Sequence, residues 1–156
     1  MPGGGTPLGF AYFAAAKFIG YSAFCRWVIE PRAAAFHSRS HITDATAFAE
    51  LPSAFKAGAA RTAIGILAGT ASGLLLFHGF LDHLGNSAMP VVIFFALLIP
   101  IRVFEWRLLL WWMYREFPFT LPTRLMLIGF GILTSFALDV IGILAAFVIP
   151  GGAWIC

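Results

Sequence analysis

The sequence predicts an all-α integral membrane protein, a bundle of four transmembrane helices with a short amphipathic cytoplasmic segment between the first two. Three observations predict this fold. Hydrophobic residues make up 60% of the 156 residues and charged residues only 11%, whereas soluble domains carry roughly 25% charged residues. Four apolar segments approach or exceed the ~20 helical residues that cross a hydrocarbon core. Lysine and arginine also alternate between the connecting segments, as an even number of crossings requires.

A single membrane domain, residues 1–156, is expected to contain the four spans, which cover residues 7–28, 59–80, 89–112 and 122–149. The residue before a proline avoids the helical conformation, so Pro31 is expected to stop the first span near Glu30. The connection that follows mixes apolar and polar residues. We expect it to form short helices on the inner membrane surface, interrupted at Pro52.

Basic residues orient the chain in the membrane. Eight of them lie in or beside the first and third connections: Arg26, Arg32, Arg39, Lys56, Arg61, Arg107, Arg115 and Arg124. The second connection and both terminal segments carry neither lysine nor arginine. The positive-inside rule therefore places the basic connections in the cytoplasm and both termini on the outer face. With no basic region before the first span, a cleaved signal is not expected, and we predict a bacterial inner membrane.

Two oppositely charged residues lie within the predicted spans. Lys17 is near the middle of the first span, and Asp139 is in the outer half of the last. These spans run in opposite directions, and a rise of ~1.5 Å per residue puts both groups in the outer half of the hydrocarbon core. We predict a structural Lys17–Asp139 ion pair. The alternatives are a lysine that reaches toward the headgroups and a proton or ion relay.

The third span carries the densest polar cluster. Glu105 and Trp106 follow Arg102 by three and four residues, so the three side chains share one helical face. One interpretation is an interhelical clamp completed by Arg61 or Arg26. The other is an inner-leaflet site for a phosphate or a lipid headgroup. Arg102, Glu105, Trp106 and Arg61 form the candidate polar site within the membrane.

Small residues predict where helices pack closely. Gly65, Gly69 and Gly73 are spaced four residues apart and therefore lie on one face of the second span. Such a stripe lets the backbone of a neighbouring helix approach. The neighbour belongs either to the same chain or to a second copy in a homodimer. Gly131, Ser135 and Gly142 form a weaker version of such a stripe in the last span.

Signals for metal binding and catalysis are sparse. His37, His41 and Asp44 form one group at helical spacing, and His78 and Asp82 form another. Such short spacings arise easily by chance at a membrane interface, so we predict no metal site. No catalytic motif or paired-cysteine motif is present in the sequence, and we predict no catalytic residues and no cofactor.

These features favour a non-catalytic membrane protein, either an accessory or structural subunit of a larger membrane complex or a self-associating bundle. One alternative is a small transporter or channel lined by Lys17, Asp139, Arg102 and Glu105. Another is an enzyme that acts on a lipid or a quinone at the inner leaflet through Arg102, Glu105 and Arg61. Membrane lipid with anionic headgroups is an expected partner. Nucleic acid is not, because the sequence has no basic stripe.

Overall fold

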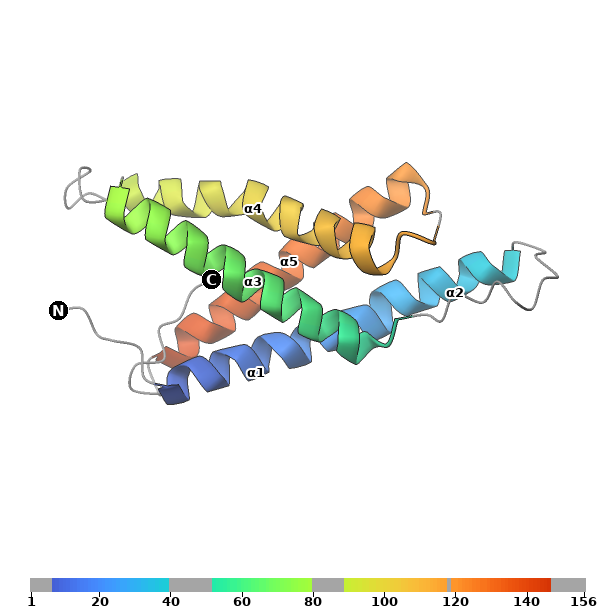
Figure 1. Cartoon of the computed structure of the whole chain (residues 1–156), viewed down its shortest axis with the longest axis horizontal. Coiled ribbons are helices and arrows are strands. Elements are labelled where there is room, and N and C mark those ends of the chain that lie inside the picture. The colour runs from blue at the N-terminus through green and yellow to red at the C-terminus, as the bar shows by residue number, and fades with distance from the viewer. Residues whose placement is uncertain (1–6, 40–51, 80–88, 118, 147–156) are drawn as a thin grey trace.

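The computed structural model describes residues 7–39, 52–79, 89–117 and 119–146, and these residues form helices and no strand. In chain order the elements are α1 (Pro7–Phe24), the π-helical turn η1 (Cys25–Ile29), α2 (Glu30–Arg39), α3 (Ala54–Gly79), α4 (Met89–Met113) and α5 (Leu121–Ala146). Because α1, η1 and α2 follow one another without a break, they make a single long helix (Figure 1). The predicted all-α class is therefore confirmed.

The helices form a ring in which each one packs against two neighbours. Both α1 and α4 contact α3 and α5. The first residues of α1 and α4 lie at the same end of the molecule as the last residues of α3 and α5 (Figure 1), so neighbouring helices are antiparallel. The exposed arginine and lysine side chains that the structure describes all lie at the opposite end, called here the basic end: Arg26, Lys56, Arg107, Arg115 and Arg124.

The predicted stop near Glu30 is wrong, because the first helix continues through Pro31 to Arg39. Proline removes one backbone donor and crowds the preceding turn. The chain widens into a π turn immediately before it, where the Glu30 N–H donates to the carbonyl oxygen of Cys25. Arg32 Nη1 donates to the Val28 carbonyl oxygen at 2.7 Å, which satisfies a backbone acceptor in the same turn.

The second long helix begins earlier than predicted. α3 starts at Ala54, five residues before the expected position, because Ser53 provides a helix cap. Its Oγ accepts a hydrogen bond from the Lys56 N–H at 3.3 Å, as expected of a serine at this position. Pro52 therefore directly precedes a long helix. Residues 40–51 lie outside the described part of the chain.

Many large apolar side chains are exposed on the surface of the helices, and several charged side chains are buried between them. Large apolar side chains are exposed on α1, α3, α4 and α5, including Ile19 at 65%, Leu67 at 71%, Phe104 at 64% and Leu133 at 64%. Five charged side chains are buried between the same helices. By length and composition, the segments Pro7–Ala35 and Leu121–Gly142 are apolar enough to cross a membrane.

Aromatic side chains fill the core toward the basic end. Trp106 is fully buried and packs edge-on against the ring of Phe24, with centroids 5.1 Å apart. Tyr114 is also buried, and burial raises the pKa of its phenol, so the group stays neutral. The neighbouring Trp111 and Trp112 point outward with 67% and 61% of their surface exposed. Trp111 and Trp112 therefore lie on the surface, whereas Tyr114 belongs to the core.

Two glycines of α5 provide a matched test of this packing. A Cβ added to Gly131 would lie 2.5 Å from the Trp106 indole, whereas one added to Gly129 would meet nothing within 4 Å. Gly131→Ala is expected to lower the free energy of unfolding by about 1–3 kcal/mol, because the buried indole must move. Gly129→Ala is expected to leave it unchanged or raise it. Thermal unfolding in detergent measures both, and equal effects would contradict the packing described here.

Candidate functional site

Five buried charged residues meet in the middle of the bundle, and all four long helices contribute. This charge network consists of Lys17 from α1, Arg61 from α3, Arg102 and Glu105 from α4, and Asp139 from α5. No member is more than 2% exposed. Charges removed from water are stable only when they are paired and hydrogen-bonded. The network therefore constrains the relative positions of all four helices.

Asp139 joins three helices. Its Oδ1 lies 2.7 Å from Lys17 Nζ on α1, and its Oδ2 accepts a hydrogen bond from Arg102 Nη2 on α4 at 3.0 Å. The carboxylate projects from α5, so a single side chain links α1, α4 and α5. The structure thus brings Lys17 and Asp139 together and adds Arg102 as a second cation on the same carboxylate.

Glu105 is the second shared carboxylate. Its Oε2 accepts a hydrogen bond from Arg61 Nη2 on α3 at 2.6 Å and another from Arg102 Nη1 at 3.1 Å. Arg102 therefore bridges the two carboxylates through its two terminal nitrogens. The planar guanidinium suits this role because its donors point in fixed, divergent directions. Arg26 takes no part, since it pairs with Glu30 at 2.8 Å on the surface.

Ser135 of α5 is the hydrogen-bonding centre beside the carboxylates. Its Oγ accepts from Trp106 Nε1 at 3.1 Å, from Tyr21 Oη at 3.3 Å and from Arg61 Nη2 at 3.3 Å. The same hydroxyl donates to the Gly131 carbonyl oxygen at 2.9 Å. These contacts tie α1, α3 and α4 to α5 a second time, through neutral groups.

Aromatic rings surround the cations. The Arg61 guanidinium carbon lies 4.7 Å from the ring centroid of Tyr21 and 4.9 Å from that of Trp106. Lys17 Nζ lies 4.3 Å from the centroid of Phe13. A cation within about 6 Å of a ring face is attracted by the negative charge of the π system, most strongly where water is excluded. The rings therefore stabilise the cations and exclude water from them.

Gly65, the first glycine of the predicted stripe in α3, lies beside an arginine of its own helix. A Cβ at Gly65 would lie 3.1 Å from Arg61 Nη1 and 3.9 Å from Arg102 Nη1. The missing side chain therefore leaves room for the Arg61 guanidinium, whereas the Arg102 guanidinium is at ordinary van der Waals distance. Gly69 is half-buried further along α3. Gly73 lies where the structure does not describe the surroundings.

The charges of the network do not balance. Three cations, Lys17, Arg61 and Arg102, face two carboxylates, Glu105 and Asp139, which leaves a formal charge of +1. Arg61 Nε and Nη1 have no hydrogen-bond partner among the described residues, and its guanidinium lies between two rings. The network contains no cysteine, histidine or hydroxyl–base pair, so its chemistry is that of ion pairing and not of nucleophilic attack.

The metal candidates fall outside what the structure describes. His41, Asp44 and Asp82 are outside the described residues, and the side chains of His37 and His78 are not described either. Within the described part of the chain, no group of three or more potential metal ligands occurs. Cys25 is a buried free thiol in η1.

Sequence reasoning missed the part played by Ser135 and Tyr21. The pattern of small residues predicts only a packing role for Ser135, whereas its hydroxyl contacts side chains of three other helices. Its position four residues before Asp139 places both on one helical face, which is the signal that could have identified it. Tyr21 likewise lies four residues after Lys17 and points to the same interior.

Charge balance predicts different effects for the two members of the Lys17–Asp139 pair. Asp139→Asn leaves three buried cations facing one carboxylate and is expected to lower the free energy of unfolding by about 3–5 kcal/mol. Lys17→Met leaves two cations facing two carboxylates, so a clearly smaller loss is expected. Equilibrium unfolding in detergent measures both, with the exposed Glu116→Gln as a control expected to change little. Equal losses for the Lys17 and Asp139 variants would contradict this account.

Comparison of the chain with protein-family models, with curated proteins and with solved structures found no match.

Proposed function

We propose that the protein is a non-catalytic membrane protein, an accessory or structural subunit or a self-associating bundle, in which all four long helices cross the membrane. The exposure of large apolar side chains and the burial of charged ones support the membrane location. A soluble monomer rarely exposes large continuous apolar patches, yet Ile19, Leu67, Phe104 and Leu133 place exposed apolar surface on all four helices. Hydrocarbon is a suitable surrounding for that surface.

The distribution of exposed charge supports an orientation. The basic end faces the cytoplasm, and both termini face outward, in agreement with the positive-inside rule. We propose a bacterial inner membrane as the location. A reporter enzyme that is active only outside the cytoplasm, fused after Cys156, is expected to be active, and the same reporter inserted after Arg39 is expected to be silent. The reverse pattern would reject the orientation.

The observation that supports a structural role is that the charged side chains of the network are buried and paired with one another. Its five side chains pair with one another, are at most 2% exposed and are covered by aromatic rings. Neither the groove beside α1 and α3 nor the cleft between α4 and α5 is lined by any of the five. A transport route needs these groups to be reachable from one face, and a lipid-processing site would need an accessible Arg102.

Purification and reconstitution test this role together. In mild detergent, the protein is expected to elute as a defined homo-oligomer or with a stoichiometric partner. In liposomes that contain a trapped pH dye, the reconstituted protein is expected to pass protons no faster than empty liposomes do. An added ionophore serves as the positive control for the dye.

Two variants distinguish the alternatives. Glu105→Gln and Asp139→Asn each neutralise one shared carboxylate, and neither is expected to change the background leak. A proton or potassium flux in the wild-type protein that either substitution abolishes would replace the structural role with transport. A stable monomer that carries out turnover on a lipid would replace it with an enzyme.

A further inference from the structure

A cleft at the basic end has the features of a ligand site and is separate from the charge network. It lies between α4 and α5 and has a volume of about 330 Å³, at the small end of the roughly 300–1,000 Å³ typical of ligand pockets. The residues that line it include Arg107, Trp111, Phe119, Leu121, Arg124 and Leu125. Apolar walls therefore meet two arginines.

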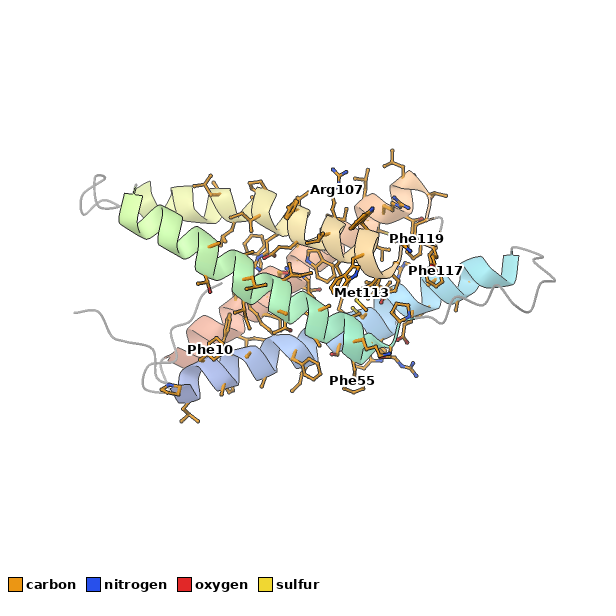
Figure 2. All side chains as sticks on the ribbon, in the orientation of Figure 1. Phe10, Phe55, Arg107, Met113, Phe117 and Phe119 are labelled. Carbon is orange, nitrogen blue, oxygen red and sulfur yellow. The ribbon has the colours of Figure 1, made fainter. Side chains whose placement is uncertain are left out.

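The charge of this α4–α5 cleft is uncompensated. The side chains of Arg107 and Arg124 are exposed, and among the described residues neither has an ion-pair partner and no carboxylate lines the cleft. In Figure 2, Arg107 points away from α1 and α3. The larger groove beside α1 and α3, about 800 Å³, differs because its Arg26 is paired with Glu30, which lines the same groove. The smaller cleft is thus better suited to an anion.

Position along the helices places both arginines near one membrane surface. Arg107 lies six residues before the end of α4, and Arg124 three residues after the start of α5. At ~1.5 Å per residue, both are within about 10 Å of the ends of their helices. Side chains of this length reach the headgroup region from such a depth. Val103 and Ile128, which also line the cleft, lie deeper along α4 and α5 and continue its apolar wall toward the hydrocarbon.

We infer that the α4–α5 cleft binds one anionic phospholipid of the inner leaflet. Arg107 and Arg124 hold the phosphate, which a guanidinium can contact through two parallel hydrogen bonds. Leu125 and the deeper lining residues Val103 and Ile128 contact the upper part of an acyl chain. Basic pockets between transmembrane helices on the cytoplasmic side bind anionic headgroups in this way. The inference rests on the proposed membrane orientation but not on the proposed structural role.

Native mass spectrometry of the full-length protein tests the site. The protein is released from detergent after incubation with phosphatidylglycerol or with phosphatidylcholine, and retained lipid is counted. Wild-type protein is expected to retain one phosphatidylglycerol in preference to phosphatidylcholine. The double variant Arg107→Gln/Arg124→Gln is expected to bind phosphatidylglycerol roughly tenfold more weakly or worse, because two phosphate contacts are lost. Each single variant is expected to show an intermediate loss.

Two exposed arginines at the same end provide matched controls. Arg115→Gln and Arg26→Gln remove the same charge outside the cleft and are expected to retain phosphatidylglycerol as the wild type does. Equal losses in these controls would show general surface attraction and overturn the site, as would full retention by the double variant. Displacement of the lipid by millimolar inorganic phosphate alone would show that the apolar walls hold no acyl chain, and would also overturn it. Unfolding midpoints and proton leak, measured in parallel, test the structural role independently.

Discussion

Two carboxylates hold three cations at the centre of this protein, and the arrangement of the helices depends on that sharing. Asp139 and Glu105 are each contacted by two cations, and Arg102 contacts both. Because a buried charge without a partner is far more costly than a lost apolar contact, no helix can shift without leaving a charge exposed to an apolar medium. The ion pairs therefore specify one arrangement of the four helices, whatever their net contribution to stability.

The positions of two buried glycines, Gly65 and Gly131, are explained by the large side chains that lie against them. Gly65 leaves space for the Arg61 guanidinium, and Gly131 leaves space for the indole that donates to Ser135. Glycine stripes in membrane helices ordinarily permit the close approach of backbones. Here the two glycines instead make room for large polar or aromatic side chains that project from α3 itself and from α4. Glycine therefore occurs where the large side chains of the interior need the space of a missing Cβ.

Much of this interior could be predicted from the sequence, because the relevant rules are local. Helical periodicity places Glu105 and Trp106 on the face of Arg102, and depth counting along antiparallel spans places Lys17 level with Asp139. The continuation through Pro31 could not be predicted, because it depends on a π turn and on a hydrogen bond from Arg32. The choice of Arg61 over Arg26 as the partner of Glu105 depends on the packing of α3, which no local pattern encodes.

The excess positive charge of the network bears on what the site can do. A third carboxylate would balance the three cations, but the described interior provides aromatic rings instead: Tyr21 and Trp106 beside Arg61, and Phe13 beside Lys17. Rings attract a cation without carrying a formal charge. A relay needs groups that gain and lose protons in sequence, and arginine, which provides two of the three cations, is not a residue type that does so. The substitution of rings for a carboxylate therefore favours a permanent clamp over a proton pathway.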